Sequence, residues 1–174
     1  MTQYFSEDGR VIPVTLLYAG PVTVSRIFQK EKDGYDAVQV DFASKKKEFR
    51  LKSTDKIDVK EGDVIDVSIF APGDRLQVSS VSKGKGFQGV VKRHGFAGGP
   101  RTHGQKHSER EAGSIGGGLR THVPRGMRMA GRMGGDRITQ KNLRVVFVDP
   151  ENNIMLVKGA LAGKRGSLVE IVSR

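Results

Sequence analysis

The middle third of the chain, from Ser82 to Arg144, most constrains the fold, because dense positive charge and frequent glycine leave it little to contribute to a hydrophobic core. It holds fourteen Lys and Arg residues against three acidic ones (Glu109, Glu111 and Asp136), a surplus of eleven positive charges. The net charge of the whole 174-residue chain is also +11, so the remaining residues sum to zero. Fifteen of the 23 glycines and all four histidines lie in this segment. A neutral body with one cationic, flexible segment is suited to binding a polyanion.

Composition narrows the classes of protein to consider. The chain has no cysteine, which excludes a disulfide framework and a thiolate metal site and fits a reducing, cytosolic setting. No apolar run approaches the roughly 20 residues that a membrane span needs, and no signal-like apolar stretch follows Met1. A chain of this length suits one domain with a core of its own. We therefore expect one domain, with no membrane segment and no targeting segment.

The two flanks, residues 1–81 and 143–174, carry the signals of β-structure. Short runs rich in Val, Ile and Phe alternate with turn formers such as Asp8-Gly9, a strong hairpin signal. The predicted strands are Val11–Tyr18, Val22–Phe28, Ala37–Phe42, Val64–Phe70, Leu76–Val81, Leu143–Val148, Ile154–Val157 and Ser167–Val172. Short, closely spaced strands favour a small barrel or sandwich.

The simplest organisation closes one β-barrel from residues 1–81 and 143–174 and lets residues 82–142 emerge as a long irregular excursion. We expect this excursion to be disordered without a partner, since it has too little apolar surface to offset the entropy of ordering. A second basic run, Lys45-Lys46-Lys47, is expected at a solvated hairpin tip, with a peripheral phosphate contact as the alternative.

A literal GxGxxG motif spans Gly84–Gly89 directly after a predicted strand. A dinucleotide site would require a helix after the glycines, to hold the pyrophosphate at its N-terminus. Gly95, Gly98 and Pro100 follow so closely that no helix of useful length is expected. We therefore attribute the glycines to a close approach of the main chain to a phosphate backbone, with Lys83 and Lys85 neutralising it.

No catalytic or metal site is predicted. His103 and His107 are four residues apart, but Gly104 lies between them and no set of four ligands is recognisable. Ser108 and Ser114 have no recognisable base and acid partners. We expect no cofactor, no metal and no small-molecule substrate, and assign the histidines to stacking on or hydrogen bonding to nucleic acid.

The stretch Val123–Gly135 alternates arginine and methionine between glycines. Arginine forks suit phosphates, and methionine fills irregular apolar gaps, so the stretch suits threading between RNA helices; a disordered cationic tail is the alternative. The predicted RNA-binding residues are Lys83, Lys85, Lys92, Arg93, His94, Arg101, His103, Lys106, His107, Arg110, Arg120, His122, Arg125, Arg128, Arg132 and Arg137.

From the residues alone, two other classes of function stay open. One is a nucleotide-dependent enzyme built on the GxGxxG motif, and the other is a general nucleic-acid-compacting basic protein that uses the segment as a cationic tail. The first predicts mononucleotide binding, and the second predicts similar affinity for duplex DNA and for RNA.

Four stretches together resemble the universal large-subunit ribosomal protein three family, in its bacterial type. They are MTQYFSEDGRVIPVTLLYAGP at the start, DGYDAVQV at Asp33–Val40, the run Ser82–Gly116 and the run Met129–Ala160. The resemblance covers nearly the whole chain.

This resemblance implies a mainly β fold, with a small closed barrel of the translation-protein type and a long basic, glycine-rich central extension. It implies a non-enzymatic constituent of the large subunit in the cytoplasm. Its partners would be 23S-type rRNA, near the 3′ end and towards the peptidyl-transferase region, and neighbouring ribosomal proteins.

The chain departs from the family pattern at three places. Relatives usually begin several residues earlier, so a clipped first strand or a differently closed barrel is expected. Only residues 43–47 stand where bacterial relatives usually carry a longer insertion, which indicates a lost peripheral contact. Gly117 stands where some relatives have a methylated glutamine, so that modification is not expected here.

Overall fold

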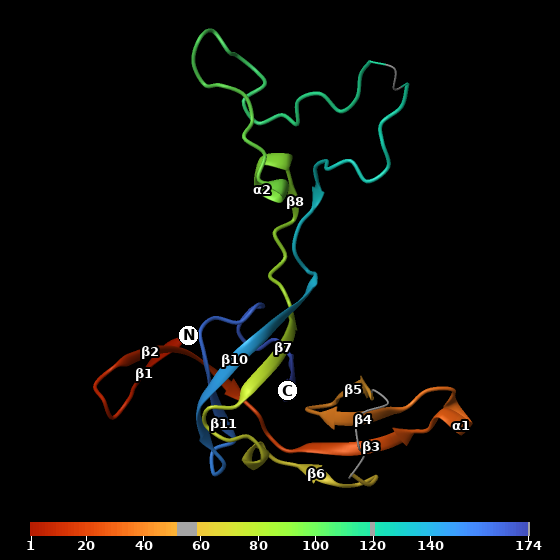
Figure 1. Ribbon diagram of the computed structural model, residues 1–174, viewed down its shortest axis with the longest axis vertical. Helices are drawn as coiled ribbons and strands as arrows, with labels where there is room; N and C mark the ends of the chain where they lie inside the picture. Colours follow the sequence, from red (N-terminus) through yellow and green to blue (C-terminus); the bar gives the residue numbers. More distant parts are fainter. Residues whose placement is uncertain (52–58, 119–120, 174) are drawn as a thin grey trace. The chain divides into compact units, whose positions relative to one another are not determined.

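The computed structural model describes residues 1–51, 59–118 and 121–173, and the fold is mainly β, as expected (Figure 1). The elements are β1 (Thr2–Phe5), β2 (Val11–Tyr18), β3 (Val22–Phe28), α1 (Lys30–Asp33), β4 (Ala37–Phe42), β5 (Lys45–Arg50), β6 (Val64–Ile65), the 3-10 helix η1 (Val67–Ile69), β7 (Arg75–Val81), β8 (Phe87–Gln88), α2 (Val90–His94), β9 (Gly131–Arg132), β10 (Arg137–Asp149), β11 (Ile154–Lys158) and β12 (Val169–Ser173). None of the helices in these described ranges is long and apolar enough to cross a membrane.

The chain divides into two compact units. The first contains Met1–Val78, Gln140–Leu161 and Ile171–Arg174, and the second contains Ser79–Thr139 and Ala162–Glu170. The core lies mainly in the first unit, where Val14, Val24, Leu76, Met155 and Val157 have no exposed surface. These residues belong to strands because β-branched and other apolar side chains pack well on a pleated, half-buried surface.

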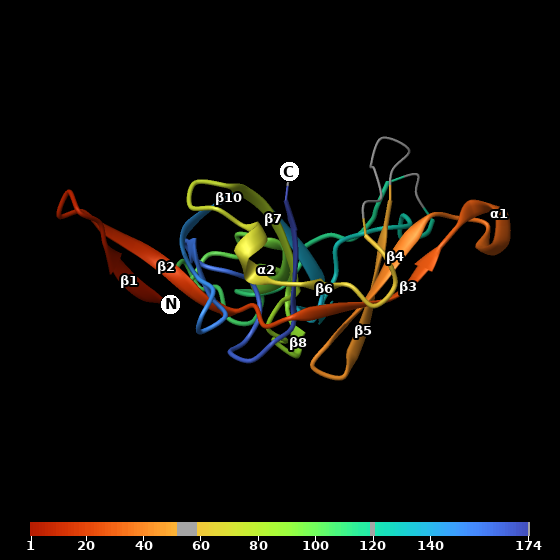
Figure 2. The same cartoon turned by 90° about the horizontal axis from the view of Figure 1, so that it is seen from below.

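The strands form two larger sheets. One has the order β1-β2-β11-β10-β7-β12, and the other has the order β5-β4-β3-β6. Strands β3, β4 and β5 lie side by side in Figure 2, and β1 and β2 form the hairpin that Asp8-Gly9 predicts. Gly9, at φ +74°, donates its N–H to the carbonyl of Ser6 (2.9 Å) and closes that turn.

The closed barrel expected from the resemblance is not found in the described part of the chain. A barrel closes only when its two edge strands hydrogen-bond to each other. Here β1 and β12 are the edges of the six-stranded sheet, and β1 pairs with β2 alone. Pairing of the edge strands β1 and β12 would join the two ends of the chain. Local runs of apolar residues predict strands, but they do not specify which distant strands pair.

Two local predictions were wrong for identifiable reasons. The strand predicted to reach Phe70 ends at Ile65, because the Asp66 carboxylate accepts the Val67 N–H (2.7 Å) and caps a 3-10 turn. The three lysines expected at a hairpin tip begin β5 instead. The turn lies just before them, at Ala43 and Ser44, whose φ angles are +46° and +65°.

The hairpin between β10 and β11 was predicted from the turn formers at residues 149–153, and it is confirmed. Asn152 donates its side-chain N–H to Asp149 Oδ2 (2.8 Å) and its backbone N–H to Asp149 Oδ1 (3.3 Å). These bonds, the side-chain bond first, lower the pKa of Asp149 because they favour the ionised carboxylate. β10 itself is longer than predicted and begins at Arg137, inside the segment expected to be irregular.

Met155→Ala should destabilise the first unit strongly. Its fully buried side chain sits on β11 between Leu17 of β2 and Val148 of β10, so truncation leaves a cavity and should cost about 2–5 kcal/mol. Urea unfolding followed by far-UV circular dichroism measures the loss. Leu16→Ala, at a position that is 53% exposed on neighbouring β2, is the control, and equal midpoints for the two variants would contradict this core.

Candidate nucleic-acid interface

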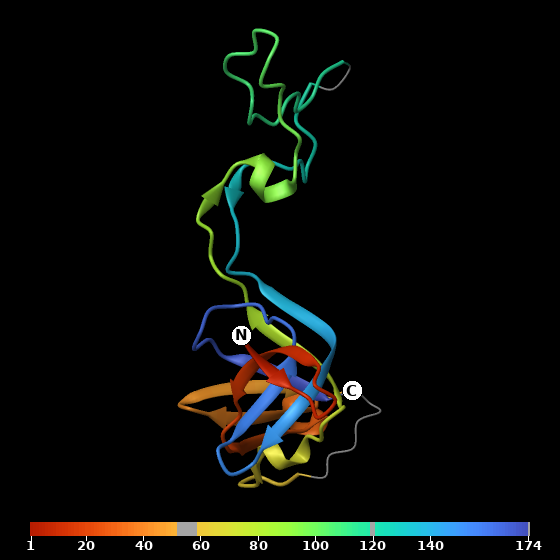
Figure 3. The same ribbon diagram turned by 90° about the vertical axis from the view of Figure 1, so that its left-hand side faces the viewer.

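The cationic segment leaves and re-enters the sheet as two legs joined by backbone hydrogen bonds. Ser82 donates its N–H to Asp136 (2.9 Å), Lys85 donates to Met133 (2.9 Å) and Met133 donates to Gly86 (2.9 Å). Further along, β8 pairs antiparallel with β9, and the two strands lie side by side in Figures 1 and 3. Residues 82–88 and 131–136, which we call the ribbon, are therefore ordered by their own main chain.

Glycine is required where the two legs approach most closely. Gly134 has φ +77°, and an added Cβ would collide with the carbonyl oxygen of Lys83 on the other leg. Only glycine tolerates both the left-handed backbone and this approach. The ribbon therefore uses some of the segment's glycines for packing of chain against chain, rather than for flexibility.

Helix α2 follows the ribbon directly, which the sequence argument did not expect. It begins after Gly89 and ends after five residues at Gly95, whose φ of +72° and N–H bond to Val91 (3.0 Å) form a left-handed cap. Arg93 donates from Nη1 to the carbonyl of Met129 (2.7 Å), and His94 Nε2 lies 3.1 Å from the same oxygen. Helix α2 thus holds the returning strand through two of the predicted RNA-binding residues.

A loop between residues 98 and 109 is closed at its base. Gly99 donates its N–H to the Glu109 carbonyl (3.0 Å), and the Arg101 Nε pairs with Glu109 Oε1 (2.5 Å). Gly98 leaves no room for a side chain against the Glu109 carbonyl. Around this loop the exposed residues include four of the predicted set: Arg101, His103, Lys106 and His107.

Two more predicted arginines have partners within the second unit. Arg137 forms an ion pair with Glu170, an acidic residue that lies far away in sequence and outside the cationic segment. The Arg128 guanidinium lies 5.5 Å from the centre of the Phe96 ring. Such contacts hold long side chains in place and reduce the entropy lost when they bind a ligand. Neither partner was recognised from the sequence, because pairings over this distance leave no local pattern.

Thirteen of the fifteen described candidates are exposed, and Arg93 and His94 are half-buried. Arg120 lies outside the described residues. The exposed ones are Lys83, Lys85, Lys92, Arg101, His103, Lys106, His107, Arg110, His122, Arg125, Arg128, Arg132 and Arg137. Between residues 95 and 130, the described positions contain no helix or strand. The candidates at the two ends of the segment therefore lie on or next to helix and strand, whereas those between residues 95 and 130 lie in turns and irregular chain.

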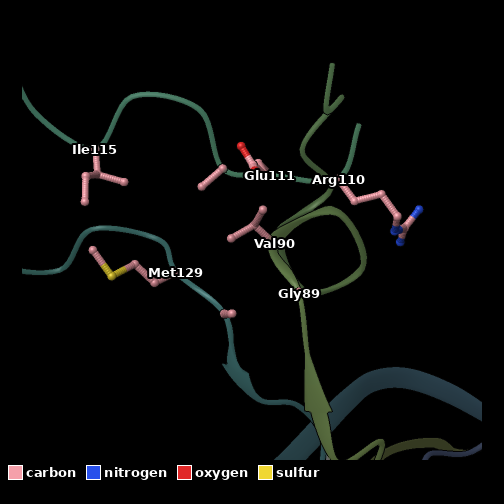
Figure 4. Close-up of a pocket in the computed structure, with 8 residues that line it drawn as sticks. Gly89, Val90, Arg110, Glu111, Ile115 and Met129 are labelled. Atoms are coloured by element: carbon pink, nitrogen blue, oxygen red, sulfur yellow. The ribbon is translucent and has the colours of Figure 1, made fainter. Parts of the chain in front are cut away.

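A small apolar pocket of about 320 Å³ lies beside α2. In Figure 4 the side chains of Val90, Ile115 and Met129 border the same space, whereas the Arg110 side chain points away from it. Val90 is nearly fully buried, so this pocket marks a minor packing centre within the second unit. In the ranges that the structure describes, no three His, Asp or Glu side chains gather as a metal site would require.

Comparison with known proteins gives one consistent result. The sequence model of the family described as Ribosomal protein L3 matches residues 23–153. The Large ribosomal subunit protein uL3 of Herpetosiphon aurantiacus is 46% identical over 195 aligned positions, which cover 100% of this chain and 92% of that protein. The protein of the same name from Chlorobium phaeobacteroides is 41% identical, over 99% of this chain and 94% of its own. Large ribosomal subunit protein uL3c of Guillardia theta is also 41% identical, over 98% and 94%.

Gly134→Ala should open the ribbon. The left-handed backbone alone costs an alanine about 1–2 kcal/mol, and the collision with the Lys83 carbonyl adds to this. Hydrogen exchange at the amides of Lys85 and Met133 should speed up. Gly84→Ala, at a position where an added Cβ meets nothing within 4 Å, should leave both amides protected. Unchanged exchange in the Gly134 variant would contradict the pairing.

Proposed function

This chain belongs to the ribosomal protein L3 family, and from that premise we propose that its cationic segment inserts into large-subunit rRNA while the β-sheets dock at the subunit surface. The protein is a structural constituent of the large ribosomal subunit, and rRNA binding is the general role of its family. In bacteria that subunit is in the cytoplasm. The family is structural rather than a class of enzymes.

One observation supports the insertion above all. Thirteen exposed cationic or imidazole side chains belong to a segment with a +11 surplus, while the rest of the chain is neutral. Phosphate contacts dominate the affinity of proteins for nucleic acids, and each contact needs an accessible cation. The segment supplies these cations along its length, and its glycines allow the main chain to approach a phosphate backbone.

We assign RNA binding to the charged part of the chain and positioning to the flanks. Residues 82–142 bind 23S-type rRNA near its 3′ end and run towards the peptidyl-transferase region, where their arginines neutralise phosphates and stiffen the surrounding RNA. The flanks, residues 1–81 and 143–174, carry a net charge of only +1 and position the segment. Exposed apolar side chains on β2, such as Leu16 and Tyr18, also suit contact with neighbouring ribosomal proteins.

Helix α2 gives no support to a nucleotide-dependent enzyme. A nucleotide site of this kind needs a helix whose first turn holds the pyrophosphate and whose length sustains a dipole. Helix α2 has only five residues, and its Arg93 and His94 side chains already bond the Met129 carbonyl. The GxGxxG motif is better explained by the ribbon, in which Gly86 accepts the Met133 N–H.

Binding of the protein to an rRNA transcript should weaken steeply with salt. If the segment contacts about 6–10 phosphates, affinity should fall by roughly 10³–10⁵ between 50 and 200 mM salt, on the scale known for duplex DNA. Filter binding over a salt series measures the slope, and duplex DNA of equal length is the competitor. A slope near zero, or equal affinity for the DNA, would contradict specific insertion into rRNA.

Two arginines serve as matched variants in the same assay. No ion pair to Arg125 is found among the described residues, so Arg125→Ala should lower the log–log slope by about 0.7–0.9. Arg137 is already neutralised by Glu170, so Arg137→Ala should change the slope less. The reverse order would show that the ion pair does not persist on RNA.

Limited proteolysis of the free protein should cut first between residues 95 and 130, where the described positions have neither helix nor strand. Trypsin is suitable because this stretch is rich in arginine and lysine. The ribbon and the sheets should survive longer, since their main-chain bonds must open before cleavage. Added rRNA should protect the stretch, and first cleavage in the sheets would contradict the expectation.

A further inference from the structure

Phe87 has the most exposed large apolar side chain in the described part of the chain, at 76%. It lies on β8, within the ribbon and in the middle of the GxGxxG motif. Its neighbours are cationic and exposed: Lys83 and Lys85 precede it, and Arg132 is its partner across the ribbon. A lone aromatic ring in such surroundings has no apolar core to join.

The Phe87 ring also has no aromatic or cationic partner among the described residues. Four ring pairs and three cation–π contacts occupy other aromatic side chains, and Phe87 takes part in none of them. Arg132 is the strand partner of Phe87, but its guanidinium lies near Gly135 on its own leg of the ribbon. A Cβ added to Gly135 would lie 2.5 Å from Arg132 Nη2. The face of the ring therefore remains available to a ligand.

The glycines of the motif do not crowd the surface around Phe87 with side chains. A Cβ placed at Gly84, Gly86 or Gly89 would meet nothing within 4 Å, so each of the three opens onto free space. The motif thus combines one exposed aromatic ring with glycines that add no side chains around it.

The ribbon holds Phe87 in place before any ligand arrives. The Lys85 N–H bond to Met133 and the Met133 N–H bond to Gly86 fix the main chain immediately before it, and the β8–β9 pairing fixes Phe87 itself. The main chain that carries the ring is thus preorganised, so little backbone entropy is lost when a ligand stacks on Phe87. Exposed cations around it attract a polyanion rather than an apolar protein surface.

We propose that Phe87 is a stacking site for an unpaired RNA base, with Lys85 and Arg132 binding the phosphates beside that base. Proteins read unpaired RNA by stacking splayed bases on aromatic side chains, and every base has a face that can stack. Phe87 lies close to Ser82, where the cationic segment begins. The site would therefore hold the RNA near the start of this segment. This inference rests on the proposed rRNA binding and names what one part of that interface recognises.

The first test compares affinities for a large-subunit rRNA transcript in full-length variants. Phe87→Ala should weaken binding roughly five- to 150-fold, the range for losing one stacked base, without changing the salt slope. Phe87→Leu, which keeps apolar surface but no aromatic face, should be nearly as weak, whereas Phe87→Tyr should bind like the wild type. Phe5→Ala is the matched control, since Phe5 is 63% exposed on β1, outside the cationic segment, and this variant should bind like the wild type.

A second test reports on stacking directly. The chain has no tryptophan, so Phe87→Trp introduces a single fluorophore at the site. Its emission should be quenched and shielded from acrylamide when the rRNA transcript binds, whereas Phe5→Trp should stay bright and accessible. Quenching in both variants would point to non-specific coating by RNA and would overturn the site.

The two hypotheses fail in different ways. If the wild-type protein does not bind the rRNA transcript, the proposed function itself is wrong. If it binds, but Phe87→Ala has wild-type affinity or a changed salt slope, rRNA binding stands and the stacking site is wrong. Circular dichroism and thermal unfolding of each variant should match the wild type, because the side chain is exposed and packs against no core.

Discussion

The interface depends on main-chain hydrogen bonds between two stretches about fifty residues apart, residues 82–88 and 131–136. A segment with this much like charge and glycine has neither the apolar surface nor the electrostatics to collapse by itself. Pairing Lys85 with Met133, and Met133 with Gly86, fixes the ends of the segment. Phe87 is itself a residue of this ribbon, and the contact of Arg93 with Met129 joins the two stretches that directly follow and precede its legs.

The arginines of the segment fall into two groups. Those that bond within the protein, such as Arg93 to the Met129 carbonyl and Arg101 to Glu109, reduce the repulsion of the segment and give it shape. Those without such partners in the described ranges, such as Arg110 and Arg125, keep their charge for a ligand. The acidic residues Glu109 and Glu170 therefore shape the candidate interface, since each forms an ion pair with one of its arginines.

Much of the fold could be predicted from local pattern. Val11–Tyr18, Val22–Phe28 and Ala37–Phe42 are strands with the predicted bounds, because β-branched alternation and turn residues act over a few positions. The prediction failed where a single side chain competed with the pattern, as Asp66 does when it caps η1. It failed again where the outcome needed distant partners, as in the expected closure of the barrel and in the extension of β10 back to Arg137.

The mainly β class, the segregation of charge into one segment and the resemblance to a ribosomal family can all be recognised without a structure, because composition and residue order carry these properties. Contacts in the folded chain determine which cations are paired, which glycines are obligatory and which aromatic ring is the most exposed. Gly134 is indispensable through the Lys83 carbonyl, and Arg137 is neutralised by Glu170. Such facts depend on contacts between residues far apart in the chain, and a contact of that kind exists only after the backbone has brought its two partners together.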